Sequence, residues 1–302
     1  IALSDGHFYI GDLREDPQQA ELTFKGAGAT ATVLQLLDHE PLGYVQAVGL
    51  KPEYFGGTAE GNFDLLMPMH EDLQFKDVKL KGTGRLNQAI ASDVFGKVEV
   101  QGDALDVNLT EQSAEVKGAI MVKGVPAELS WQRIFDQPDE NQPPVRIKAI
   151  LDQPEREALG LKISHLVQGP IPVELAIARN AQGATALSMQ GDLTNAKLIF
   201  GNMGWTKAAG RPAAIQFDVA EGEDGSTDLK NFKITGDDIA IDGTVELTPE
   251  QHLKGFYFSD FSFDSQTHVE ISATVRDGDV LDVEPGAVEG AVGRDGPEHL
   301  AD

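Results

Sequence analysis

Apolar and polar residues alternate along much of the chain with a period of two, the pattern of strands that bury one face. The clearest runs are Val98 and Val100 followed by Leu105, Val107 and Leu109; Ile120 and Val122 followed by Val125, Ala127, Leu129 and Trp131; Val145 to Leu151; Ile171, Val173, Leu175 and Ile177; Ala213, Ile215, Phe217 and Val219; and Val269 to Val275. Successive runs lie about ten residues apart, so we expect an antiparallel meander.

Short Gly- and Asp-containing segments separate these runs and are predicted turns. They are Gly102-Asp103, Asp224-Gly225, Gly236-Asp237-Asp238 and Asp277-Gly278. The segments 98–107 and 232–241 resemble each other, and each is interpreted as a strand, a Gly-Asp turn and a second strand. A hairpin unit repeated along the chain is one interpretation, and the similarity of any two hairpins is the other.

Helical patterns are scarce. In the segment Ala29–Asp38, Val33, Leu34 and Leu37 fall on one helical face, and Pro41 prevents continuation. Residues 41–48 are a second candidate, and residues 155–158 have room for a single turn.

The predicted fold class is therefore mainly β: an elongated, curled antiparallel meander, groove-like or taco-like, with one or two short helices near residues 29–48. The apolar face needs a cover, which either a second sheet layer or curling of the sheet supplies. We expect a single β domain over residues 1–280. An acidic, glycine-rich tail over residues 281–302 is a candidate for disorder.

Charge and composition exclude several classes of function. With 24 basic and 49 acidic residues the formal charge is −25, so nucleic acid is not an expected partner. The absence of Cys excludes disulfides, thiolate metal sites and a cysteine nucleophile. The chain begins with Ile1 and contains no long apolar run, so we expect a piece of a longer protein whose membrane tether lies elsewhere.

Candidate chemistry is sparse. Gly26, Gly28 and Ala31 match a dinucleotide-binding fingerprint, but no second parallel strand follows, so we expect a plain strand-to-helix connection. The seven histidines are scattered without a ligand or nucleophile spacing. The acidic segment 221–228 offers oxygen ligands for Ca²⁺, yet its composition is equally that of a hairpin turn. We therefore predict no enzyme, no catalytic residue, no cofactor and no metal.

Four phenylalanines, Phe256, Phe258, Phe261 and Phe263, form the densest aromatic group. Their spacing changes phase at Asp260, which predicts either a bulge or two pairs on opposite faces. Core packing is the simplest role for them, and an apolar wall beside a ligand is the alternative.

Several short motifs occur together in an order that resembles the bacterial AsmA-like family. They are Leu36-Leu37-Asp38, Pro41-Leu42-Gly43-Tyr44, Gly49-Leu50-Lys51-Pro52, Gly56 to Gly61, Met67-Pro68-Met69, Gly124-Val125-Pro126, Leu129-Ser130-Trp131 and Gly204-Trp205-Thr206-Lys207. The chain is most similar to the DUF3971-containing branch, which includes the YhdP and TamB proteins. The resemblance extends over about residues 1–280.

This resemblance implies a periplasmic segment of an inner-membrane-anchored protein. Its apolar β groove would carry or shield phospholipid acyl chains between the inner and outer membranes. Other envelope proteins are possible partners, and no catalytic residue is implied. The alternative hypothesis is a non-enzymatic periplasmic module that binds protein partners.

The candidate groove-lining, lipid-binding residues are the apolar members of the alternating runs. They are Val98, Val100, Leu105, Val107, Leu109, Ile171, Val173, Leu175, Ile177, Ile215, Phe217, Ile239 and Ile241. Closed core packing is the alternative role for each of them.

Overall fold

A computed structural model describes residues 1–12, 14, 17–39, 45, 50–73, 77–92, 98–179, 184–201, 204–222, 224–263, 268–276 and 279–289. Side chains are described up to Val275. The chain divides into two compact units. Unit 1 comprises residues 1–151 and 174–186, and unit 2 comprises residues 152–173 and 187–302.

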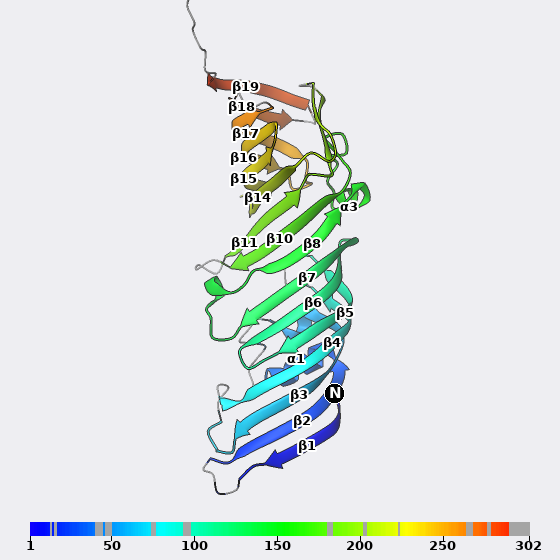
Figure 1. The fold of residues 1–302 in the computed structure, drawn as a ribbon, viewed down its shortest axis with the longest axis vertical. Helices are drawn as coiled ribbons and strands as arrows, with labels where there is room; N and C mark the ends of the chain where they lie inside the picture. The colour runs from blue at the N-terminus through cyan, green and yellow to red at the C-terminus, as the bar shows by residue number, and fades with distance from the viewer. Residues whose placement is uncertain are drawn as a thin grey trace, which may run out of the picture. The chain divides into compact units, whose positions relative to one another are not determined.

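In the described part of unit 1, a run of antiparallel strands is accompanied by helix α1 (Figure 1). Its elements are β1 (Ala2–Ile10), β2 (Gln19–Ala29), α1 (Thr30–Leu37), the 3-10 turn η1 (Pro52–Tyr54), β3 (Phe55–Pro68), β4 (Lys79–Ala91), β5 (Val100–Leu109), β6 (Ser113–Val122), β7 (Val125–Ile134), the 3-10 turn η3 (Asp139–Asn141) and β8 (Val145–Leu151). Strands β10 (Ile171–Arg179) and β11 (Thr185–Asp192) contribute residues to both units.

Unit 2 adds a second, small sheet to its strands. Its other elements are α3 (Gln153–Ala158), β9 (Val167–Gln168), β12 (Lys197–Phe200), β13 (Trp205–Lys207), β14 (Ala213–Glu221), β15 (Thr227–Gly236), β16 (Ile239–Leu247), β17 (Leu253–Ser262), β18 (His268–Arg276) and β19 (Asp279–Glu289). Strands β13, β12 and β9 form the three-stranded sheet.

The large sheet is an antiparallel meander, as the alternation predicts. Among the described residues it has sixteen strands that follow one another in chain order, omitting β9, β12 and β13. The sheet is not closed, because β1 and β19 stand at its two ends. Many neighbouring antiparallel strands are joined by short connections, whereas the longer connections from β2 to β3, β8 to β10 and β11 to β14 contain α1, α3 and the strands of the small sheet.

Strand register places the apolar residues of neighbouring strands on the same face. Ala20, Leu22 and Phe24 of β2 are buried or half-buried, whereas the residues between them are largely exposed. Leu22 pairs with Leu65, and Phe24 pairs with Phe63 of β3. A shift by one residue would turn this apolar face to solvent, so the pattern fixes the register.

One predicted turn is wrong. Gly102 and Asp103 lie inside the continuous strand β5. The register shifts between Gln101 and Asp106 along the β5–β6 pair, so the phase change in the sequence marks a bulge. The two similar segments therefore differ in structure, because Asp237 and Asp238 do form a turn between β15 and β16.

Of the two remaining predicted turns, one is confirmed and the other lies outside the described residues. Asp224 and Gly225 connect β14 and β15 as predicted. Asp277 and Gly278 lie outside the described residues.

The first predicted helix is confirmed as α1, which starts directly after β2. The second candidate, residues 41–48, lies outside the described residues except for Val45. The single turn expected at 155–158 is part of α3, where the carboxylate of Asp152 accepts a hydrogen bond from the backbone N–H of Gln153.

The core of unit 2 lies between its main strands and the small sheet. Leu198 of β12 is buried together with Ile234, Ile239, Ile241 and Phe258 of the large sheet. The small sheet therefore covers this apolar face as a second layer.

Phe256, Phe258 and Phe261 of β17 and Phe263 directly after it belong to this core, and the strand contains the predicted bulge. The register shifts where Asp242 pairs with Asp260 and the next residue, Gly243, pairs with Phe258. The extra residue returns Phe258 and Phe261 to the same buried face, with ring centroids 6.0 Å apart.

Lys207 anchors the small sheet. Its ammonium group donates hydrogen bonds to the carbonyls of Leu193 (2.7 Å), Ala196 (2.8 Å), Thr194 (3.2 Å) and Ala208 (3.3 Å). Burial lowers the pKa of the Lys207 ammonium from its ordinary value. Backbone oxygens compensate this buried cation in place of a carboxylate.

The predicted domain boundary at residue 280 falls inside β19, which pairs with β18 through Glu289. The remaining tail residues, 290–302, lie outside the described residues.

Candidate apolar ligand site

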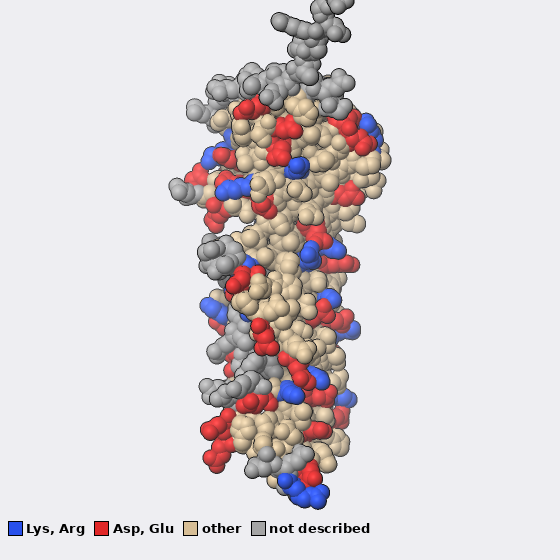
Figure 2. Space-filling model, turned by 60° about the vertical axis from the view of Figure 1, so that its left-hand side comes forward, with Lys and Arg blue, Asp and Glu red and all other residues tan. Residues whose placement is uncertain are grey.

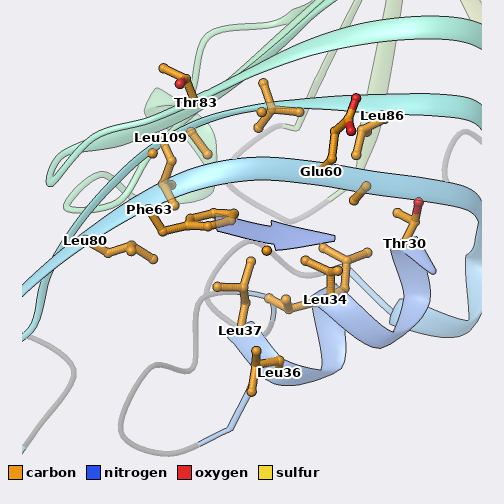
Figure 3. A pocket seen from close by; sticks show the side chains of 18 of the residues that line it. Thr30, Leu34, Leu36, Leu37, Glu60, Phe63, Leu80, Thr83, Leu86 and Leu109 are labelled. Carbon is orange, nitrogen blue, oxygen red and sulfur yellow. The ribbon is translucent and has the colours of Figure 1, made fainter. Parts of the chain in front are cut away.

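An apolar cavity of about 220 Å³ lies in unit 1 between α1 and one face of the sheet (Figure 3). Its walls come from α1, from strands β1 to β7 and from the segments that follow α1 and β7. The lining residues are Ile1, Leu3, Phe24, Gly26, Thr30, Val33, Leu34, Leu36, Leu37, Val45, Leu50, Phe55, Ala59, Glu60, Phe63, Leu65, Leu80, Gly82, Thr83, Gly84, Arg85, Leu86, Val107, Leu109, Ala114, Val116, Trp131 and Phe135.

Helix α1 forms the roof of the cavity. Because it continues directly from β2, its position above β2 and β3 is fixed at its first residue. Val33, Leu34 and Leu37 face the sheet and line the cavity, while Gln35 is exposed. The helical period thus supplies apolar side chains to the roof and polar ones to solvent.

A row of glycines forms part of the floor. Gly26 of β2 pairs with Gly61 of β3, which pairs with Gly84 of β4. An added Cβ would lie 2.8 Å from the backbone oxygen of Thr83 at Gly61, and 2.7 Å from that of Glu60 at Gly84. Backbone atoms therefore replace side chains along this row, and this leaves space beneath α1.

Aromatic and aliphatic side chains complete the floor and the end wall. The ring of Phe63 stacks on Phe24 with centroids 5.4 Å apart. Leu80 and Leu109 are buried beside Phe63, and Leu37 of α1 packs against the same cluster. Such a surface favours an apolar ligand, because burial removes apolar area from water without a polar cost.

Glu60, Thr83 and Arg85 are the polar residues on the sheet side of the lining, and two of them form polar contacts with other side chains. Glu60 accepts a hydrogen bond of 3.2 Å from the side-chain amide of Asn87, and Arg85 forms an ion pair of 3.0 Å with Asp106. Glu60, Thr83 and Arg85 occupy exposed positions that alternate with the cavity-facing residues of their strands. Their side chains therefore belong to the outer face of the sheet.

Thr30, the first residue of α1, is the polar exception among the residues of the roof. The residue is 2% exposed; its Oγ1 is fully buried, closed off from the cavity, and has no hydrogen-bond partner among the described atoms. Buried hydroxyls are normally hydrogen-bonded, so this group stands out.

Groups with shifted pKa values lie away from the cavity lining within the described residues. Asp139 is an example: its hydrogen bond of 2.6 Å from Arg133, with a further contact from Arg179, lowers the pKa of its carboxyl group below 3.8. Among all the residues that the structure describes, no group of three His, Asp or Glu side chains is placed to hold a metal ion. What the cavity offers chemically is the exclusion of water from an apolar group.

Of the predicted lipid-contact residues, Val107 and Leu109 line the cavity. Val100 and Leu105 are buried in a neighbouring cluster of β4 to β8, and Val98 is half-buried just before β5. Of the five candidates between Val98 and Leu109, two therefore line the cavity and three lie outside its lining.

The remaining candidates lie elsewhere. Five of them, Ile171, Val173, Ile215, Ile239 and Ile241, are buried in or packed against the core of unit 2. Phe217 stacks near Phe232 with centroids 6.1 Å apart, Ile177 is buried and Leu175 is half-buried. Core packing accounts for the burial of the unit 2 residues without a ligand.

Sequence patterns missed the roof, the glycine row and Thr30. Alternate glycines at Gly26 and Gly28 and at Gly82 and Gly84 were a usable signal, because glycine at every second position strips side chains from one face of a strand. Both pairs lie in antiparallel strands, and Gly28 pairs with Ala59, so the dinucleotide-type match is a strand-to-helix connection as expected.

Comparisons with protein-family models, with curated proteins and with solved structures find no match. The resemblance to the AsmA-like family stays a prediction from the sequence motifs. Across the described residues, no helix has the length and apolar character required to cross a membrane.

Proposed function

We propose that this chain is a non-enzymatic segment of a bacterial envelope protein that holds or shields phospholipid acyl chains between the inner and outer membranes. In this proposal it works in the periplasm as part of an inner-membrane-anchored, AsmA-like protein of the DUF3971-containing branch. The observation that carries the proposal is the apolar cavity beneath α1, with a volume of about 220 Å³.

The size and lining of the cavity suit a hydrocarbon chain. An apolar cavity of roughly 150 Å³ is large enough to stay dry and bind benzene. Each methylene that moves from water into such a site contributes about 0.8 kcal/mol. A segment of a single acyl chain therefore gains several kcal/mol here, and the gain needs no charged contact.

The surface charge supports contact through chains in preference to headgroups. The formal charge is −25, and acidic side chains are spread over the face seen in Figure 2. Such a surface repels anionic headgroups. In this proposal the lipid is bound through contacts between its acyl chain and the apolar lining of the cavity.

Native mass spectrometry of the gently purified chain tests this proposal. We expect one bound lipid on the wild type and none on Ala114→Phe, because Ala114 lines the cavity and a ring there fills it. Ala119→Phe is the matched control, since Ala119 is exposed on the same strand. Lipid-free wild type, or equal lipid on both variants with folding confirmed by circular dichroism, would overturn the proposal.

The alternative is a module that binds a protein partner through the edge of the sheet. Within the described chain β1 pairs only with β2, and its side chains Leu3 and Phe8 are 62% and 58% exposed. An exposed, apolar edge strand is a template for a strand from another chain. A photo-crosslinking residue at Phe8 that traps a defined protein, while one at Val107 traps no lipid, would favour this alternative.

A further inference from the structure

The outer face of the sheet in unit 1, which is the face opposite the cavity, carries a row of mainly apolar residues across five neighbouring strands. The row consists of Ile90 of β4, Gln101 of β5, Met121 of β6, Pro126 of β7 and Ile150 of β8. Strand register pairs each of the first four with the next, and the pairing of β7 with β8 continues the row to Ile150. We call these five residues the outer row.

The side chains of the outer row point away from the core. Their neighbours along the strands lie in or pack against the core cluster of β4 to β8; these neighbours are Ala89, Val100, Val122, Ala127 and Ala149. Adjacent residues of a strand point to opposite faces of the sheet. In agreement, Ile90, Met121 and Ile150 are 38%, 41% and 62% exposed, and Pro126 is exposed as well.

Many other exposed positions on this face are charged. Examples are Lys81 and Arg85 of β4, Asp106 of β5, Lys117 of β6 and Arg146 of β8. The outer row departs from this pattern on four adjacent or nearly adjacent strands. Contiguous exposed apolar side chains with a polar surround are typical of an interaction surface.

The spacing of the outer row favours a helical partner. Neighbouring strands lie about 4.8 Å apart, and an α-helix rises about 5.4 Å per turn. A helix laid across the strands therefore presents about one side chain per turn to each strand. A strand laid the same way presents same-face side chains about 6.7 Å apart, which is a poorer match. The four intervals of the row amount to about 19 Å, the length of about 13 helical residues.

The charges beside the outer row indicate which side chains flank the apolar face of that helix. Glu99, Asp103 and Glu128 are exposed at positions two residues from the row. Lys123 and Lys148 occupy equivalent positions, but Lys148 already lies 3.4 Å from an acidic residue of β10 in an ion pair. The surround is therefore acidic on balance, like the whole chain with its formal charge of −25. It complements Lys or Arg on the partner.

We propose that the outer row is the docking surface for an amphipathic, basic α-helix of a partner protein. The helix lies across β4 to β8, places its apolar side chains on the row, and turns Lys or Arg toward the acidic surround. An anionic membrane surface is disfavoured as the occupant, because the acidic surround repels it. The row and the cavity lie on opposite faces of the sheet, so this inference goes beyond the proposed function and does not depend on it.

Fluorescence anisotropy of labelled synthetic peptides with the full chain tests the inference. The probe has about 18 residues, enough to form a helix that spans the row, with leucine once per turn, lysine at the flanking positions and alanine elsewhere. A peptide of the same composition with a scrambled order has no apolar face. We expect the amphipathic peptide to bind at least about tenfold more tightly than the scrambled one. Its binding should weaken as the salt concentration rises.

A double variant, Met121→Ser with Ile150→Ser, places the binding on the outer row. It should weaken binding of the amphipathic peptide by about tenfold, because two apolar side chains are lost from the contact. Asn108→Ser is the matched control, since Asn108 is exposed on the same face of β5 and lies outside the row. Its affinity should stay within about twofold of the wild type. Circular dichroism checks that both variants fold.

Three results would overturn the inference. They are the same affinity for the amphipathic and scrambled peptides, no binding of either peptide, and wild-type affinity in the folded double variant. Vesicles of phosphatidylglycerol that bind the wild type but not the double variant would assign the row to a membrane and would also overturn it. None of these results changes the lipid expected in the cavity, so a failure here leaves the proposed function standing.

Discussion

At the scale of single residues, Thr30 and Thr32 differ in surroundings although both lie in the first turn of α1. Thr30 is buried with an unpaired hydroxyl, whereas Thr32 is exposed. An unpaired buried hydroxyl destabilises the folded state, since it gives up its hydrogen bonds to water. Thr30 is therefore a position at which the hydroxyl lowers the stability of the fold.

Thr30→Val should therefore stabilise the ligand-free protein. We expect the free energy of unfolding to rise by about 1 kcal/mol, because a methyl group has no hydrogen bond to lose. Urea unfolding of delipidated protein measures the change. Thr32→Val is the control and should change stability by less than about 0.5 kcal/mol. A loss of stability in Thr30→Val would show that the hydroxyl is already satisfied.

Lys207 is a second residue whose environment predicts a measurable contribution to the free energy of unfolding. The residue is 1% exposed, and its ammonium group donates hydrogen bonds to the carbonyls of Leu193 and Ala196. Lys207→Met leaves these carbonyls without a donor and should lower the free energy of unfolding by about 2–4 kcal/mol. Lys197→Met, at an exposed site of β12, should have little effect in the same denaturation experiment. Equal losses for the two variants would contradict a structural role for Lys207.

Asp139 supplies a pH dependence in unit 1. Hydrogen bonds from Arg133 and Arg179 lower the pKa of its carboxyl group in the folded state. Its contribution is therefore complete above the unfolded value of 3.8 and is lost as pH falls through the lower folded pKa. The carboxylate is partly exposed, so solvent screens the pairs.

For Asp139→Asn we expect a loss of less than about 1 kcal/mol at pH 7 and convergence with the wild type in strong acid. Urea unfolding across pH measures both. Asp136→Asn, at a neighbouring exposed site, serves as the control. A difference that persists unchanged in strong acid would argue against the ion pairs as its cause.

At the scale of elements, the alternation pattern predicted the strands and the antiparallel meander, because one-sided burial imposes a period of two on the sequence. It misplaced Gly102 and Asp103, since a bulge and a turn favour the same small and polar residues. Strands β9, β12 and β13 have only two, four and three residues, too few for a periodic signal. The alternation pattern therefore could not predict the small sheet that covers the core of unit 2.

The glycine row is the element-scale feature that sets the depth of the cavity. Gly61→Ala places a Cβ 2.8 Å from the backbone oxygen of Thr83, so the strands must shift. We expect a loss of about 1–3 kcal/mol in the free energy of unfolding and weaker binding of palmitate. In β1, Gly6→Ala meets no atom within 4 Å and is the matched control. Unaltered stability and binding in Gly61→Ala would contradict the close packing of β3 and β4.

At the scale of the whole chain, the strands of both units show the same alternation of apolar and polar residues, but the apolar faces of the two units are covered differently. The sequence predicted a single β domain over residues 1–280, and it offered a second layer or a curled sheet as covers for the apolar face. In unit 2 a second small sheet covers the core, and in unit 1 helix α1 roofs a cavity. Which apolar run faces which cover depends on register and on contacts between distant strands, so it could not be derived from one strand at a time.

The central claim is that the cavity beneath α1 holds an acyl chain, and photo-crosslinking in living bacteria tests it most directly. Val107 lines the cavity, while its neighbour Asn108 is exposed on the opposite face of β5. A photo-activated residue at 107 should form a lipid adduct that mass spectrometry identifies, and the same residue at 108 should form far less. Equal labelling at the two positions, or no lipid adduct at 107, would contradict the account.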